Sequence, residues 1–127
     1  MTDAPENELI LAIDSNIATV TLNRPQRRNA ITFEMYEEIR QICKRAGKEG
    51  DLKGIKALLF MGGGDKAFAA GTDILRFKDF TSTQDAIDYE TRIDSVMEEI
   101  ESCAVPTIAA LNGFVTGGGA AIAGACT

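Results

Sequence analysis

Three consecutive glycines at residues 117–119 are the part of this sequence best suited to chemistry. They follow the segment PTIAALNG of residues 106–113 and lead into the small residues of 120–125. The pattern predicts the start of a helix, where the first N–H groups have no partner within the helix and the helix dipole favours negative charge. Glycine leaves these groups unscreened. The run therefore predicts a backbone site for an oxyanion.

A second segment, KAFAAGTDI at residues 66–74, also predicts a backbone site for a ligand oxygen. It follows an apolar run at 55–61 and a GGGD turn at 62–65. If the apolar run is a buried strand, the small residues after it allow a ligand to lie against the main chain. Thr72 can then present its N–H to the same oxygen as Gly118. We expect two donors from distant segments to bind one carbonyl oxygen.

At these segments the chain resembles the N-terminal half of the crotonase (enoyl-CoA hydratase/isomerase) family. The resemblance spans roughly residues 9–127 and is carried by TLNRPQRRNAI at 21–31, AFAAGTDI at 67–74 and PTIAALNGFVTGGG at 106–119. It implies an α/β fold of ββα units wound in a spiral. It also implies one crotonase-like domain over residues 1–127, with residues 1–8 as a flexible tail, truncated before the family's C-terminal helical part.

The resemblance also assigns roles to residues. It implies that the backbone N–H groups of Thr72 and Gly118 form the oxyanion hole. Threonine in place of the family's frequent alanine at position 72 does little harm, because the main chain donates the hydrogen bond. The residues implied to bind coenzyme A are Arg28 and Ala30 beside its adenosine or phosphate portion, and Ala69, Ala70, Gly71 and Asp73 along the ligand. Asp73 has a simpler alternative as a helix cap, because a carboxylate after a glycine turn often has that role.

The expected function is acyl-CoA processing of the enoyl-CoA hydratase/isomerase type, in fatty acid metabolism, through a thioester enolate. Hydratases of the family carry a glutamate two residues after the glycine triplet, and a second one about twenty residues later. Here Ala121 occupies the first position, and the second lies beyond Thr127. Double-bond isomerisation, thioester hydrolysis, decarboxylation and a non-catalytic acyl-CoA-binding paralogue therefore stay open. The family subunit is about twice as long and assembles as trimers, so we expect a homotrimer or hexamer.

Composition limits the alternatives. A chain of 127 residues fits one domain. A net charge of −6 and a pI near 4.6 argue against nucleic-acid binding. A polyanionic CoA thioester then requires local cations, and Arg24, Arg27 and Arg28 form the basic cluster. The absence of histidine excludes a Ser-His-Asp triad and a histidine metal site. We expect no cofactor apart from coenzyme A as part of the substrate, and no metal.

The three cysteines and the acidic N-terminus favour a soluble cytoplasmic protein. Cys43, Cys103 and Cys126 contain no C-x-x-C pair and are expected to be reduced thiols. Residues 1–8 are acidic and lack the features of a secretory signal. The uncharged segment 102–127 is long enough to suggest a transmembrane helix and contains a G-x-x-x-G pattern at 113–117, but its apolar residues are mostly small and Pro106 and Asn112-Gly113 interrupt it. We therefore expect no membrane partner.

The elements that must position these groups can be predicted from periodicity and capping. Residues 9–13 and 17–22 form a hairpin. Thr32 caps a helix over 33–48, which Gly47 and Gly50 end, with Tyr36, Ile39, Cys43 and Ala46 on one face. Residues 55–61 and 108–111 are strands. Ser82 or Thr83 caps a helix over 84–102 whose core-facing residues are Ile87, Ile93, Val96, Met97 and Ile100.

Two further interpretations compete with the site. Residues 62–67, GGGDKA, formally match the G-x-G-x-x-A nucleotide motif after a strand, but the residues that follow do not continue an amphipathic helix. The small residues at 120–125 could simply allow a buried helix to pack closely. The sequence shows no internal repeat.

Overall fold

The computed structural model describes residues 8–46, 50–52 and 54–127. Most of the expected N-terminal tail and the predicted helix end at Gly47 therefore lie outside the described residues. Glu8, the last residue of that tail, is held in place, because its carbonyl accepts a hydrogen bond from the Asn23 amide at 2.8 Å.

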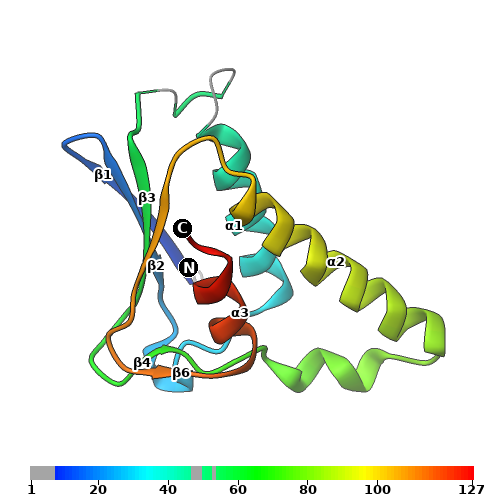
Figure 1. The fold of residues 1–127 in the computed structure, drawn as a ribbon. Coiled ribbons are helices and arrows are strands. Elements are labelled where there is room, and N and C mark those ends of the chain that lie inside the picture. The colour runs from blue at the N-terminus through cyan, green and yellow to red at the C-terminus, as the bar shows by residue number, and fades with distance from the viewer. Residues whose placement is uncertain (1–7, 47–49, 53) are drawn as a thin grey trace, which may run out of the picture.

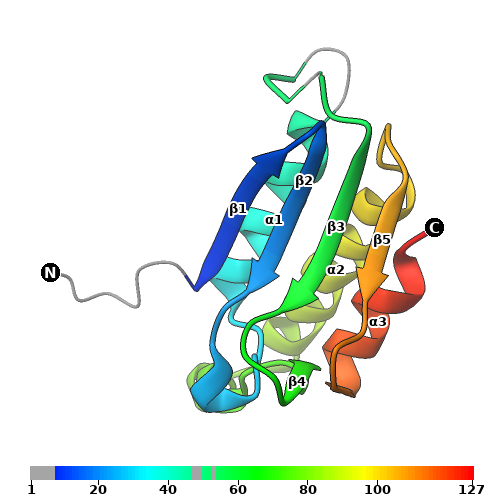
Figure 2. The ribbon, with the colours of Figure 1, turned by 90° about the vertical axis from the view of Figure 1, so that its left-hand side faces the viewer.

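A four-stranded sheet forms one layer of the molecule (Figure 2). The strand order is β1 (Leu9–Asp14), β2 (Ile17–Leu22), β3 (Ala57–Gly62) and β5 (Thr107–Ala110). Strands β1 and β2 are antiparallel, and β2–β3 and β3–β5 are parallel. Ser15 and Asn16 join the first two strands with φ of 53° and 72°, the left-handed pair that a tight hairpin turn requires. The predicted hairpin is confirmed.

Three helices cover one face of this sheet (Figure 1). They are α1 (Phe33–Arg45), α2 (Thr83–Glu101) and α3 (Gly117–Ala125). The Thr32 hydroxyl accepts from the Met35 amide and caps α1, as predicted, and Ser82 caps α2 through the Asp85 amide. Helices α1 and α2 begin within a residue of their predicted starts, because capping is a local interaction.

A small second sheet lies at one end of the main one (Figure 1). It pairs β4 (Ala67–Ala69) with β6 (Phe114–Val115). Two 3₁₀ segments, η1 (Pro25–Arg27) and η2 (Ile74–Asp79), complete the order of elements. The described chain therefore consists of three ββα units, β1–β2–α1, β3–β4–α2 and β5–β6–α3. The repeat is one of structure, although the sequence shows none.

The core lies between the main sheet and the helices. Ala18, Val20 and Leu22 alternate along β2 and are fully buried, because every second side chain of the strand faces the helices. The predicted buried stripe of α2 is wrong at Ile87, whose side chain is 50% exposed, whereas Val96 and Ile100 are buried. Helix α3 buries one face only, through Gly119, Ile122 and Ala125.

The nucleotide-motif and membrane-span interpretations can now be assessed. Gly62 ends β3 and residues 67–69 form a strand, so the helix that a dinucleotide motif requires does not follow the glycine turn. Among the described residues, no helix is both long and apolar enough to cross a membrane.

Candidate active site

The segment at residues 69–73 is held between two other parts of the chain. On one side the Ala70 amide donates to Arg28 O at 2.9 Å, and Ile31 exchanges hydrogen bonds with Gly71 O and the Asp73 amide at 2.8 and 2.9 Å. On the other side Thr116 donates its amide to Ala69 O and its hydroxyl to Ala70 O. The three sequence motifs therefore meet at this segment.

Each glycine of the triplet is required for a different reason. Gly117 has a φ of 52°, which side chains rarely adopt. A Cβ at Gly118 would overlap the Tyr36 hydroxyl, and a Cβ at Gly119 would overlap the Ala69 carbonyl oxygen. Close packing thus applies to the glycine triplet, whereas within 120–125, the range of the competing interpretation, Ala120, Ala121 and Gly124 are exposed. The same packing brings the start of α3 against residues 69–72.

The backbone amides of Thr72 and Gly118 lie on adjoining segments. A Cβ at Gly118 would lie 3.0 Å from Thr72 Oγ1. The next two amides of α3, at Gly119 and Ala120, both donate to Thr116 O. Within the described part of the chain, the Thr72 and Gly118 amides have no hydrogen-bond acceptor. Both amides are therefore free donors, one in the first turn of α3 and one on the adjoining segment, and their role as an oxyanion hole stays a prediction.

Tyr36 of α1 reaches both of these residues. Its side chain is fully buried, and its hydroxyl lies 2.7 Å from Thr72 Oγ1. Burial raises the pKa of the Tyr36 phenol above its ordinary value of 10.0, and the hydrogen bond to Thr72 opposes this only in part. The phenol is therefore protonated at neutral pH. The periodicity of the sequence predicts Tyr36 on the core-facing side of the helix, but no sequence pattern connects it with the site.

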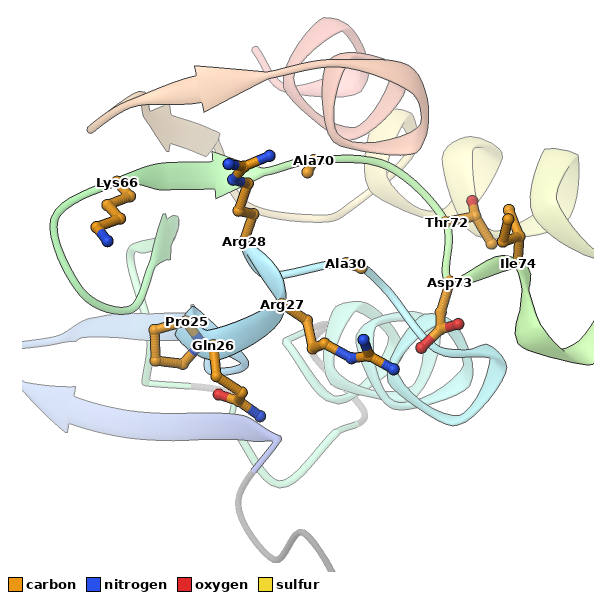
Figure 3. A pocket seen from close by; sticks show the side chains of 10 residues that line it. All are labelled: Pro25, Gln26, Arg27, Arg28, Ala30, Lys66, Ala70, Thr72, Asp73 and Ile74. Carbon is orange, nitrogen blue, oxygen red and sulfur yellow. The ribbon is translucent and has the colours of Figure 1, made fainter.

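An open pocket of about 610 Å³ lies beside Thr72 (Figure 3). Arg28 and Lys66 lie on one side of it, and Thr72, Asp73 and Ile74 on the other. The residues that line it are Pro25, Gln26, Arg27, Arg28, Ala30, Lys66, Ala70, Thr72, Asp73 and Ile74. Three of them are cationic, in a chain whose net charge is −6. The pocket therefore suits an anionic ligand.

The predicted basic cluster divides into two parts. Arg27 and Arg28 are exposed at the pocket, whereas Arg24 is 9% exposed. Its guanidinium Nη1 lies 3.0 Å from Asp73 Oδ2 and donates to Ala30 O at 2.8 Å. Its Nε lies 3.2 Å from Glu8 Oε2 without hydrogen-bond geometry. Arg24 therefore supports the site from inside and is not a surface cation for ligand.

Asp73 is the acidic partner of Arg24 in these buried contacts. Its carboxylate pairs with Arg24, so it is not a free acid, and its expected role as a helix cap, here before η2, stays a prediction. Among the described residues that line the pocket, it is the one carboxylate.

Asn29 ties the first motif to the strand ends. It is fully buried in the left-handed conformation, with φ 59°. Its Oδ1 accepts from the Arg24 amide at 2.8 Å, and its Nδ2 donates to Gly63 O and Ala67 O at 3.0 and 2.8 Å. Asn29 lies in the TLNRPQRRNAI motif and Lys66 in the KAFAAGTDI segment, but the sequence predicted no separate role for either.

The other predicted ligand-binding residues fall at or beneath the pocket. Arg28, Ala30 and Ala70 line it, whereas Ala69 and Gly71 are buried under its edge. Ala121, at the position of the family's first glutamate, is exposed on α3. Its methyl group cannot accept or donate a proton.

The fold and the site together define an α/β protein in which two glycine-rich turns from separate ββα units meet beside a cationic pocket. The sequence profile of the family described as enoyl-CoA hydratase/isomerase matches residues 12–127. The chain therefore belongs to the enoyl-CoA hydratase/isomerase, or crotonase, family.

Named relatives agree with this assignment. The chain is 32% identical over 120 residues to a short-chain-enoyl-CoA hydratase of Clostridium acetobutylicum, covering 94% of this chain and 44% of that protein. It is 33% identical over 118 residues to a crotonyl-CoA hydratase of Syntrophomonas wolfei, covering 93% and 44%. The chain thus spans less than half the length of these relatives.

Solved structures confirm the expected crotonase-like fold. The structure of an enoyl-CoA hydratase from Bacillus anthracis superposes with a TM-score of 0.82 at 26% identity, over 94% of this chain and 45% of that one. An enoyl-CoA hydratase/carnithine racemase from Magnetospirillum magneticum gives 0.83 at 32% identity, over 94% and 44%.

Proposed function

We propose that the protein that carries this chain is an acyl-CoA-processing enzyme of the enoyl-CoA hydratase/isomerase type. The observation that carries the proposal is the pair of acceptor-free amides at Thr72 and Gly118, on adjoining turns beside a pocket. Hydration of an enoyl thioester, or migration of its double bond, places negative charge on the thioester oxygen. Two fixed N–H donors at that oxygen stabilise the resulting enolate.

The expected contribution of these two N–H donors to the rate is large. Loss of a single oxyanion donor in other enzymes costs about 3 kcal/mol, or roughly a hundredfold in kcat. The donors at Thr72 and Gly118 are held by hydrogen bonds between backbone segments, so little reorganisation is needed when charge develops. Binding ground state and transition state equally well would not accelerate the reaction, whereas donors matched to the enolate do.

The cationic side of the pocket supports a CoA ester as the substrate. Arg27, Arg28 and Lys66 line it, and phosphate groups pair well with arginine and lysine. The adenosine and phosphate portion would lie at this side, with the pantetheine running along residues 69–72. As the family resemblance implies, we also expect assembly as a homotrimer or hexamer.

Because the catalytic acid or base is not identified, a second reaction competes with hydration. Ala121 supplies no carboxylate, and Asp73 is paired with Arg24. Hydration needs a group to activate water. Double-bond isomerisation needs one group that carries a proton between two carbons of the same acyl chain but needs no activated water, so it is the second candidate. A binding protein without turnover is the third outcome that the experiment must separate.

The test measures the protein that carries this chain with crotonyl-CoA and, separately, with a 3-enoyl-CoA. Formation of 3-hydroxyacyl-CoA supports hydration, and formation of the 2-enoyl-CoA supports isomerisation. Binding without any product would leave an acyl-CoA-binding paralogue. Absence of both binding and turnover would refute the proposal.

The amide pair is tested by exchanging one N–H for an oxygen. Replacing Gly118 by glycolic acid removes the donor and adds no side chain, so the Tyr36 contact is kept. We expect kcat to fall roughly a hundredfold. The matched control is the same exchange at Gly64, an exposed glycine whose amide also has no acceptor among the described residues. Equal effects at both positions would contradict the assignment of Gly118.

A further inference from the structure

The Tyr36 hydroxyl contacts both residues of the amide pair. It hydrogen-bonds Thr72 Oγ1 at 2.7 Å, and it lies so close to Gly118 that no Cβ fits between them. These contacts join α1, the segment after β4 and the first turn of α3. The three elements come from three different ββα units.

The burial of this hydroxyl makes the contact costly to lose. The Tyr36 side chain is fully buried, so its hydroxyl cannot exchange Thr72 for water. A buried polar group without a partner costs more free energy than an average hydrogen bond contributes. The Tyr36–Thr72 contact therefore restricts where the Thr72 side chain, and with it the adjoining backbone, can lie.

Gly118 is restricted from the same side. The Tyr36 ring is fixed in the core, and its hydroxyl packs against the Gly118 α-carbon where any other residue would carry a side chain. Packed interiors resist shifts of a few tenths of an ångström. The position of one oxygen atom thus limits both the Thr72 and the Gly118 segments.

We propose that Tyr36 is a positioning residue that sets the spacing between the Thr72 and Gly118 amides through its hydroxyl. This inference rests on the proposed function, because spacing matters only if both amides bind one oxygen. The Tyr36 side chain is fully buried and does not line the pocket, so we assign it no contact with the substrate. The threonine at position 72 supplies the partner that an alanine would lack.

The test is a double-mutant cycle with Tyr36→Phe and Thr72→Val in the protein that carries this chain. Each change removes one hydroxyl and keeps the shape of the side chain, and Thr72→Val also keeps the backbone N–H. We expect each single variant to lower kcat about 3- to 10-fold with KM changed less than twofold, because the effect is on the transition state. The double variant should lose no more than either single variant.

A spectroscopic measurement separates positioning from simple stability. The carbonyl stretch of a bound ¹³C-labelled acyl-CoA reports how strongly the amides polarise the thioester. In both single variants this band should move towards the position of the free ligand. Tyr89→Phe is the matched control, since Tyr89 is the other tyrosine of the chain and packs against Phe33, Phe77 and Phe80. It should leave kcat within about twofold and the carbonyl band unchanged.

The outcomes distinguish this inference from the proposed function. If the wild-type protein neither binds nor converts acyl-CoA, the proposed function and this inference both fail. If the wild type is active and both single variants keep its kcat and its carbonyl band, the inference alone fails. Should Tyr36→Phe not fold, Thr72→Val decides by the same two measurements.

Discussion

Polar side chains are used differently at the site and on the outer face of α1. At the site, Asn29 and Arg24 are buried and contact groups from distant segments, such as Ala67 O and Asp73. On the outer face and just after the helix, Glu37 pairs with Arg40 at 2.9 Å and Arg45 with Asp51 at 2.7 Å. Those partners are near in sequence and stay in contact with water.

The difference shows that a short distance does not measure a contribution to stability. The Arg45–Asp51 pair is closer than the Arg24–Asp73 pair, but its side chains are 42% and 68% exposed against 10% and 14%. When an exposed pair breaks, water replaces the lost partner. When a buried contact breaks, the freed groups stay without one. Substitutions should therefore be felt at the site far more than on the outer face.

The largest effect is expected for Asn29→Ala. The change leaves the Arg24 amide and the carbonyls of Gly63 and Ala67 without their side-chain partner, and we expect a loss of about 3 kcal/mol in the free energy of unfolding. Urea denaturation measures it. Asn16→Ala is the matched control, because Asn16 shares the left-handed backbone but is exposed. It should cost about 1 kcal/mol. Equal losses would remove the contrast between buried and exposed contacts.

A somewhat smaller effect is expected for Gly118→Ala. Its methyl group would overlap the Tyr36 hydroxyl, and overpacking of this kind costs about 2 kcal/mol. Denaturation of Gly118→Ala in two backgrounds checks the cause. In a Tyr36→Phe background the hydroxyl is absent and the nearest ring carbon lies 3.4 Å from the new Cβ, so most of the loss should disappear. An undiminished loss would show that the hydroxyl is not the obstacle.

The exposed cations of the pocket should affect ligand binding and leave stability nearly unchanged. We expect Arg28→Gln and Lys66→Gln each to weaken acyl-CoA binding about fivefold, or about 1 kcal/mol, because they line the pocket but have water on one side. Calorimetric titration should show the difference shrinking as salt is added. Lys44→Gln removes an exposed cation of α1 and should bind ligand like the wild type. A similar loss in Lys44→Gln would point to net charge alone.

The smallest effect is expected for Glu37→Gln. Hydrogen bonds from Arg40 and Gln41 lower the pKa of Glu37 to about 2, below its ordinary 4.5. The ionised carboxylate therefore stabilises the fold above about pH 4.5, and this contribution is lost as the pH falls towards 2. Because Glu37 is 45% exposed, we expect no more than about 0.5 kcal/mol at pH 7. Denaturation at pH 7 and pH 2.5 should show a smaller difference at the lower pH.

The parts of the fold that depend on near neighbours could be predicted from the sequence. The hairpin follows from alternating residues around a turn, and the N-cap of α1 follows from Thr32 and the amide three residues later. The prediction that Ile87 is buried was wrong. An apolar stripe indicates which face of a helix is buried, but not how far the neighbouring elements extend along that face. The three ββα units share no sequence pattern, because a unit is defined by backbone pairing that many sequences satisfy.

Within the site, the motifs indicated which segments matter but not what each side chain does. Arg24 and Arg28 belong to the same basic cluster, yet one is buried against Asp73 and the other lines the pocket. No local pattern separates them, since burial depends on segments 40 to 50 residues away. The positions of Lys66 and Tyr36 at the site were not predicted for the same reason.

The sequence by itself determined the family and the segments that carry its site, because glycine and alanine are required wherever backbones approach closely. It also determined where the hairpin turns and where the helices start, because turns and caps depend on adjacent residues. Only the tertiary structure decided that the Thr72 and Gly118 segments adjoin and that the Tyr36 hydroxyl contacts both. These contacts join residues 36 to 82 positions apart, and such distances in sequence are closed only when the three ββα units pack around a common core.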